Sequence, residues 1–333
     1  MQGNREARIK MPWKCYELEY KAKSAIHIGY GTQLGIVSRT RYYIPGKTIW
    51  GAVTAALSRR IMGNYDAEIY RKMGEFVKHH LIFSYFYPVK EGDVLYPNYT
   101  EEGFGFGNKG GGEFVMTKGE FEKEFISSYI STALDKNSMT AEEGSLHEFE
   151  LISQKVKGEE VCFTGYLFMK EGGINFGTNK KYIFVKNVGK ETIMDMGSDN
   201  TSLFEAITNI LVGGERNYGF GWLNLNEQPI ETDEIYGKYK VELNSDYPRI
   251  EVKKEMVALS HVLMDGNERI EWIKGDIEPL VGREWDDERG KGAGQKISDV
   301  KICLTPGTRF SLKEGEEIRV GDFGIWEIGE VEN

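Results

Sequence analysis

Two apolar patterns of different period follow one another near the N-terminus, and their order constrains the fold more than any other feature. In residues 15–28 apolar and charged side chains alternate, which predicts a half-buried strand. In residues 48–61 apolar side chains recur at helical spacing, with Thr48 as the expected N-cap and Gly63 as the expected stop. A strand that feeds a helix through a loop indicates an α+β domain rather than an all-β or all-α protein.

The same alternation of periods continues to about residue 230. Further strands are expected at 81–89, 146–152, 160–169, 181–186 and 220–225, and a second helix at 202–212. This order of strand, helix, strands, helix and strand predicts a ferredoxin-like (RRM-like) α+β domain over residues 1–235. The glycine-rich region 103–112 fits neither period and is expected to be an exposed insertion, 121–134 has weak helical spacing, and the insertion as a whole spans about 89–145. A smaller β-rich second domain is expected at 236–333.

The charge is divided unevenly along the chain. The net charge is -10, yet residues 1–90 hold 15 Lys and Arg against 6 Asp and Glu, and the remainder holds 27 against 46. A phosphate-binding face needs local rather than total positive charge, so this division is compatible with a nucleic-acid partner. The alternative is that two lobes are simply solvated differently.

Other features exclude several classes of protein. The three cysteines have no metal-ligand spacing and are expected to be free thiols in a reducing cytoplasm. No apolar run reaches the length of a membrane span, and the charged N-terminus lacks the apolar stretch of a secretory signal. We therefore expect a cytoplasmic protein with no membrane partner, no metal and no cofactor.

The glycine-rich segment 213–221 is the clearest candidate for a binding loop. It comprises Gly213, Gly214, Glu215, Arg216, Asn217, Tyr218, Gly219, Phe220 and Gly221. Four glycines in nine residues permit positive φ and close approach of a phosphodiester, Arg216 adds charge, and Tyr218 and Phe220 offer rings for stacking bases. The segment lacks the Gly-Lys-Ser/Thr of a P-loop. A glycine-rich helix end and tight turn without a ligand is the alternative.

A second candidate lies just before the first expected helix. It contains Arg39, Arg41, Tyr42, Tyr43, Gly46, Lys47 and Thr48. Cations and aromatic rings beside a helix N-terminus suit phosphates and unpaired bases. The alternative is a solvated loop with a Pro-Gly turn. We expect this helix start and the 213–221 loop to approach one groove.

These motifs resemble those of the CRISPR-associated RAMP superfamily. The resemblance rests on 24–29, 44–52 and 213–221, on 84–88, which is most like the handle-capping branch, and on 140–150, which is similar to the central hairpin. The C-terminal segment 279–307 is similar to capping subunits of type III systems and points to subtype III-D. The resemblance implies a subunit that grips the 5′ repeat-derived handle of the crRNA, beside the large polymerase-like subunit and the first backbone subunit.

Two other readings compete with this one. Type III backbone subunits cut RNA with an aspartate after the first strand, but residues 29–46 contain no Asp or Glu, and Asp135 is more typical of an exposed acid. Repeat-processing relatives use histidine in acid–base chemistry, and none of the five histidines here has a partner that sequence establishes. We expect no catalytic residue. An endoribonuclease and a protein-only scaffold remain the alternatives.

Overall fold

The computed structural model describes residues 12–34, 36–61, 67–110, 113–132, 145–176, 182–189, 191–195, 200–264, 269–286 and 292–330. Gly63, Asp135 and the segment 140–144, to which the sequence assigned roles, lie outside these ranges. No helix within the described ranges has the length and apolar character needed to cross a membrane.

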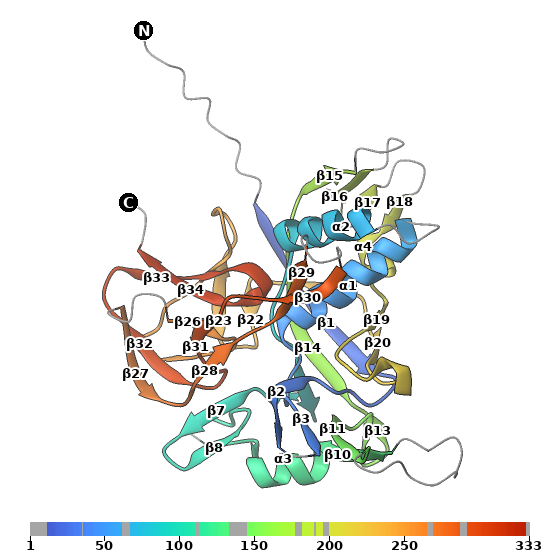
Figure 1. The fold of residues 1–333 in the computed structure, drawn as a ribbon. Coiled ribbons are helices and arrows are strands. Elements are labelled where there is room, and N and C mark those ends of the chain that lie inside the picture. Colours follow the sequence, from blue (N-terminus) through green and yellow to red (C-terminus); the bar gives the residue numbers. More distant parts are fainter. Residues whose placement is uncertain are drawn as a thin grey trace, which may run out of the picture.

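A central sheet organises the first 231 residues. Its path runs β19 (Asn209–Leu211), β20 (Trp222–Leu225), β1 (Trp13–Ala22), β14 (Cys162–Lys170), β5 (Tyr87–Lys90) and β6 (Asp93–Val94), with β4 (Leu81–Phe83) also on β14 and β21 (Ile230–Glu231) on β1. β1 and β14 are antiparallel, with Leu18 opposite Gly165. Helices α1 (Gly46–Ile61), α2 (Ala67–His80) and the short α4 (Leu203–Ala206) lie on one side of this sheet (Figure 1).

The other face of the sheet is covered by the C-terminal strands (Figure 1). They form one sheet in the order β22 (Glu234–Ile235), β23 (Tyr239–Glu242), β24 (Arg249–Ile250), β33 (Glu316–Val320), β34 (Trp326–Glu330), β26 (Val262–Leu263), β31 (Lys301–Leu304) and β28 (Ile277–Leu280). A second sheet contains β25 (Met256–Val257), β32 (Arg309–Leu312) and β27 (Ile270–Lys274), and β29 (Arg283–Asp286) pairs with β30 (Gly292–Ile297).

Both faces of β14 are therefore buried. Successive side chains along the strand point alternately into two different cores. Leu167 and Met169 pack into the core under the helices, whereas Tyr166 and Phe168 pack into the core shared with the C-terminal strands. This explains why the strand reads as an almost continuous apolar run instead of an alternating one.

Two smaller groups of strands extend from the central sheet. One contains β2 (Gly29–Leu34), β3 (Val37–Thr40), β11 (His147–Ile152) and β10 (Ile126–Ser131), next to α3 (Lys118–Phe125) and the sheet of β7 (Pro97–Thr100), β8 (Gly103–Phe106) and β9 (Met116–Thr117). The other contains β15 (Gly172–Asn175), β16 (Tyr182–Val188), β17 (Glu191–Asp195) and β18 (Asn200–Ser202), and β12 (Lys155–Val156) pairs with β13 (Glu159–Glu160).

Several sequence predictions were wrong in detail. β1 ends at Ala22 rather than residue 28, because Ile26 exchanges backbone hydrogen bonds with Ile152 in the neighbouring sheet. The expected loop 29–46 contains the β2–β3 hairpin. α1 begins at Gly46, so Thr48 lies in its first turn instead of capping it. α2 was not predicted. Its charged residues lie on the exposed side of the helix, and Ile69, Met73 and Phe76 are buried.

The second expected helix is also wrong, since only Leu203–Ala206 is helical and Asn209–Leu211 forms β19. Ile207, Ile210 and Val212 are all buried, and these β-branched residues fit a strand as well as a helix. The glycine-rich insertion is likewise more ordered than expected. It contains β8, whose Phe106 is fully buried and stacks on Phe121 at 4.0 Å between ring centroids.

Candidate nucleic-acid interface

The 213–221 loop packs tightly on the segment that follows β1. Gly213 has φ 73°, and a Cβ there would lie 2.1 Å from the His27 carbonyl oxygen. Gly221 has φ 90°, and a Cβ there would lie 2.0 Å from the Val212 carbonyl oxygen. Two N–H groups of the loop are consumed by this packing: that of Gly214 donates to the His27 carbonyl at 3.0 Å and that of Gly221 donates to the Ala25 carbonyl at 2.8 Å.

These contacts correct the expected role of the glycines. Gly213, Gly214 and Gly221 dock the loop on residues 25–27, and the N–H of Gly219 donates to the Arg216 carbonyl at 2.9 Å. The N–H groups of Gly214, Gly219 and Gly221 thus have acceptors within the protein, and the exposed side chains of the loop add to its capacity to bind.

Those side chains are presented outward on a single turn. Arg216, Asn217 and Tyr218 form a short 3₁₀ helix between residues of left-handed conformation, Glu215 at φ 53° and Gly219 at φ 84°. All three are exposed. The Arg216 Nε donates to the Gly213 carbonyl at 3.0 Å, which fixes the base of the guanidinium on the loop.

Tyr218 belongs to a surface cluster of rings that we call the aromatic platform, made of Tyr129, His147, Phe149, Tyr218 and Phe220. The Tyr218 centroid lies 5.6 Å from Tyr129, 5.8 Å from Phe149 and 6.3 Å from Phe220, with Phe220 in a stacked orientation. His147 lies 4.9 Å from Phe149. Tyr129 and Tyr218 keep 42% and 43% of their surface exposed, so the platform has open area for a base.

Sequence reasoning found Tyr218 and Phe220 but missed the other three members of the platform. Tyr129 lies on β10 and His147 and Phe149 on β11, far from the loop in sequence. The sequence did indicate a strand with aromatic residues at 146–152. It could not indicate that this strand lies next to the 213–221 loop.

Arg39 lies on the neighbouring β3 and is connected to the same region through Glu150. Its Nε is 3.7 Å from the Glu150 carboxylate, while the Glu150 carbonyl is 2.8 Å from His27 Nδ1, the residue on which the glycine loop docks. The Arg39 side chain is 37% exposed, so this long, half-solvated ion pair leaves the guanidinium open to an anion. Glu150 on β11 therefore links Arg39 to the segment on which the loop docks.

Arg41, two residues on, is placed very differently. Its Nη1 lies 2.8 Å from Glu278 and donates to the Tyr43 hydroxyl at 2.9 Å, and its side chain is 10% exposed. Burial alone would raise the pKa of Glu278, but the hydrogen bond from His261 and the charge of Arg41 outweigh it and lower the pKa to about 2. Arg41 is thus neutralised inside the protein, and we no longer count it among phosphate ligands.

The two tyrosines beside Arg41 are also packed inward. Tyr43 is 7% exposed and stacks on Tyr85 at 5.5 Å between centroids, and Tyr42 leans on Phe106 and Phe121. Tyr43 is therefore closed to an unpaired base, whereas Tyr42 is half-buried.

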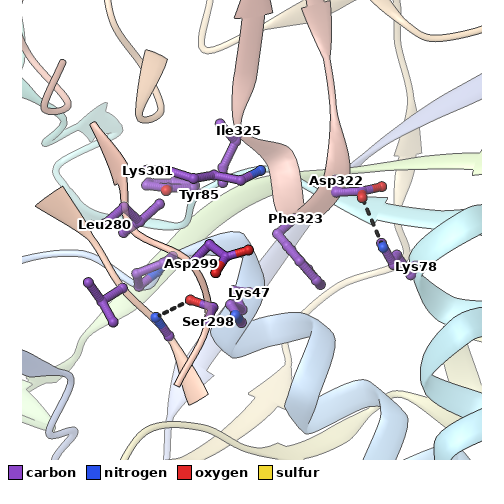
Figure 2. Close-up of a pocket in the computed structure, with 13 residues that line it drawn as sticks. Lys47, Lys78, Tyr85, Leu280, Ser298, Asp299, Lys301, Asp322, Phe323 and Ile325 are labelled. Carbon is purple, nitrogen blue, oxygen red and sulfur yellow. Dashed lines mark hydrogen bonds and ion pairs between the residues drawn. The ribbon is translucent and has the colours of Figure 1, made fainter. Parts of the chain in front are cut away.

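The start of α1 faces a separate cavity of about 230 Å³ (Figure 2). Gly46 is buried, and a Cβ there would lie 2.2 Å from the Phe323 carbonyl oxygen. The Lys47 Nζ lies 5.2 Å from the centre of the Phe323 ring, and the N–H of Thr48 donates to Pro45 at 2.9 Å. No residue of 213–221 lines the cavity. Its other lining residues are Pro45, Lys78, Tyr85, Leu280, Val281, Gly282, Ser298, Asp299, Lys301, Asp322 and Ile325. The expected single groove is therefore two distinct sites.

Three of the five histidines, His27, His80 and His261, are held by partners inside the protein. His261 has partners typical of acid–base catalysis, since its Nδ1 contacts the Tyr85 hydroxyl at 2.5 Å and its Nε2 contacts Glu278. However, its side chain is 0% exposed and burial lowers its pKa, so an RNA phosphate cannot reach it. His80 is held by the Lys170 carbonyl and His27 by that of Glu150. No group of three or more potential metal ligands occurs among the described residues.

Together, the fold and the site define an α+β protein with a glycine-rich loop that carries exposed aromatic and basic side chains. A family model described as the RAMP superfamily matches residues 19–224, and the chain belongs to that superfamily. No curated protein matches the chain.

Solved structures extend the likeness beyond the matched residues. A chain of the type III-B Cmr-beta complex bound to cognate target RNA and AMPPnP is 11% identical, with a TM-score of 0.52 over 88% of this chain and 85% of that one. A chain of the same complex bound to cognate target RNA is 10% identical, with a TM-score of 0.50 over 94% and 99%. At this identity the likeness shows a shared fold, and the chain resembles subunits of type III effector complexes in its architecture.

Proposed function

We propose that the chain is a non-catalytic subunit of a type III CRISPR effector complex that binds the 5′ repeat-derived handle of the crRNA. In this role it contacts the large polymerase-like subunit and the first backbone subunit, and it works in the cytoplasm. The observation that carries the proposal is the aromatic platform beside Arg216. Open rings next to an exposed guanidinium, on the glycine-rich loop of a RAMP protein, suit a single-stranded RNA.

The arrangement of the central sheet supports a ferredoxin-like domain. Four of its strands follow the path β20, β1, β14, β5, all antiparallel to their neighbours, and the helices lie on one face. This is the pattern of a split βαβ unit in which β1 and β14 occupy the centre. We place the boundary with the second, β-rich domain near residue 235.

Within this proposal the roles of the candidate residues are narrower than the sequence suggested. Arg39 and Arg216 contact phosphates, and Tyr218 and Phe220 contact bases. Asn217 offers an amide at the same turn, while Gly213, Gly214, Gly219 and Gly221 shape it. Lys47 lines the separate cavity at the start of α1, with Thr48 next to it in the first turn, and any RNA contact there is a second one.

The test is to purify the tagged protein from its host in EDTA and to sequence the RNA that crosslinks to it. We expect crosslinks at crRNA 5′ handles, with the modified peptides spanning residues 213–221 and 126–152. Crosslinks concentrated on uncut repeats would favour a processing endoribonuclease. Absence of RNA from an otherwise intact assembly would favour a protein-only scaffold.

A further inference from the structure

A groove of about 480 Å³, distinct from the aromatic platform, opens where three parts of the chain meet. Its lining residues come from the β2–β3 hairpin and the segment after it, from the β7–β8 hairpin, and from the turns next to β28 and β31. These elements are labelled in Figure 1. We call this site the Tyr30 groove. Its lining combines aromatic, basic and acidic side chains, which is the mixture that nucleotide sites need.

Tyr30 forms a stacking surface on one wall. The Arg41 guanidinium lies 4.8 Å from the centre of the Tyr30 ring, and Arg41 is itself held by Glu278 and Tyr43. A buried, ion-paired cation thus supports one side of the ring, whereas 44% of Tyr30 remains exposed. A ring held in this way loses little entropy when a base stacks on it.

The opposite wall supplies further rings and a hydrogen-bond acceptor. Tyr99 and Phe104 lie 4.8 Å apart between ring centroids, and the Tyr99 hydroxyl donates to the Asp276 carboxylate. The pKa of Tyr99 is raised, first by burial and then by this hydrogen bond. Tyr30 also raises the pKa of Tyr99 to a smaller extent, so the two tyrosines are close enough to interact electrostatically. Because an ionised carboxylate only accepts hydrogen bonds, Asp276 favours a base that carries an amino group.

The edge of the groove carries two cations. The Arg39 Nε lies 3.7 Å from Glu150, and the Lys118 Nζ lies 3.8 Å from Glu122. Their side chains are 37% and 49% exposed, so both ion pairs are long and solvated, and both cations can turn to a phosphate at little cost.

We propose that the Tyr30 groove receives one unpaired, amino-bearing base of a bound RNA, stacked on Tyr30 and hydrogen-bonded to Asp276, with its phosphate at Arg39 and Lys118. The inference rests on the proposed RNA-binding function and deepens it. Adenine, cytosine and guanine each carry an exocyclic amino group that can donate to Asp276, whereas uracil carries only carbonyl oxygens at the corresponding ring positions. A free nucleotide presents the same groups, and the experiment separates the two sources.

The test is fluorescence anisotropy with labelled eight-nucleotide rA, rC and rU and the full chain. Tyr30→Ala should weaken rA and rC binding by about 5- to 150-fold, the range for loss of one base–aromatic stack, and Tyr30→Phe should restore it. Asp276→Asn should reduce the preference for rA and rC over rU. Tyr247→Ala removes an equally exposed tyrosine outside the groove and should change nothing.

Arg216→Ala, measured in parallel, separates the groove from the platform. One outcome is that Tyr30→Ala binds rA as the wild type does while Arg216→Ala loses affinity. That result would contradict the proposal that the Tyr30 groove binds a base, and the proposed RNA-binding function would stand. If the wild type binds no octamer, the proposed function fails. Saturation-transfer NMR with AMP and CMP then tests whether the groove binds a free nucleotide. If AMP or CMP binds and Tyr30→Ala abolishes the binding, the ligand of the groove is a free nucleotide. If neither binds, the groove is not a nucleotide site.

Discussion

Arg41 and Arg216 carry the same guanidinium, and their surroundings give it different tasks. Arg41 is 10% exposed and paired with Glu278 across the two lobes of the chain, whereas Arg216 is exposed on the glycine loop. Fixing a buried cation requires its counter-ion, because an unpaired buried charge costs several kcal/mol. An exposed arginine has no such requirement and is available to a ligand.

Glu278→Gln is expected to destabilise the fold by about 3 kcal/mol at pH 7, because it leaves Arg41 buried without a counter-ion. The pKa of Glu278 falls from its ordinary 4.5 to about 2 in the folded chain, so its stabilisation is present above about pH 4.5 and is lost as the pH falls toward 2. Urea unfolding should therefore show a gap between wild type and variant that narrows over this interval.

The matched control for this prediction is Glu314→Gln, which makes the same change on an exposed turn and should cost little at any pH. An equal effect of both substitutions would show that the pair with Arg41 contributes no special stability.

Arg216→Ala is expected to weaken binding of single-stranded RNA and to reduce the slope of log K against log salt by about 0.7, the share of one phosphate on a single strand. Titrations at several salt concentrations measure the slope. Lys254→Ala removes the same charge at an exposed position outside the site. If both variants show the same slope as the wild type, Arg216 does not contact a phosphate.

At the scale of the element, the glycine loop depends on two different properties of glycine. Gly219 and Gly221 both have positive φ, at 84° and 90°, but a Cβ at Gly219 would meet nothing within 4 Å, whereas one at Gly221 would collide with the Val212 backbone. Gly219 is required only for its left-handed backbone conformation. Gly221 is required for that conformation and also because there is no room for a Cβ beside Val212.

Gly221→Ala should therefore destabilise the chain more than Gly219→Ala. We expect about 1 kcal/mol for Gly219→Ala, from the left-handed conformation alone, and about 3 kcal/mol for Gly221→Ala, where the loop must also move from Val212. Thermal unfolding measures both. Equal losses would mean that the loop relaxes freely and that its docking on residues 25–27 is weak.

Elements with a single dominant pattern could be predicted from the sequence, and those decided by neighbours could not. α1 and β14 lie close to their predicted ranges because their apolar runs are long. The segment 202–212 has an apolar stripe that suits a helix, but pairing with β20 makes Asn209–Leu211 a strand. α2 was missed although Ile69, Met73 and Val77 recur at helical spacing and Asp66, a residue type favoured at N-caps, precedes its start in the sequence.

The candidate site shows the same division. Tyr218 and Arg216 were recognisable because glycines mark an exposed turn. Arg41, Tyr42 and Tyr43 have equally suggestive neighbours in sequence, yet they point inward because residues from the insertion and from beyond 236 cover them. Contacts between segments so distant in sequence leave no local pattern.

At the scale of the whole molecule, the central sheet is shared between two cores. Phe86 belongs to the core under the helices, and its neighbours Tyr85 and Tyr87 belong to the core shared with the C-terminal strands. The tyrosine hydroxyls also complete their hydrogen bonds there: Tyr87 donates to the Leu259 carbonyl at 3.0 Å, and Tyr166 accepts from the Tyr236 N–H at 2.7 Å. The proposed boundary near residue 235 would therefore divide the two large sheets without dividing the core that they share.

A fragment ending at residue 235 should consequently fail to fold as a stable unit. It would expose Tyr85, Tyr87, Tyr166 and Phe168, which are at most 3% exposed in the full chain, and leave their polar atoms without protein partners. We expect the full chain to unfold in urea in a single transition seen alike by fluorescence and circular dichroism. We expect the fragment to bind the dye ANS and to unfold gradually. A sharp, cooperative transition of the fragment would show instead that the helical side of the sheet supplies enough burial alone, and that the C-terminal lobe is a separate module added to a RAMP domain.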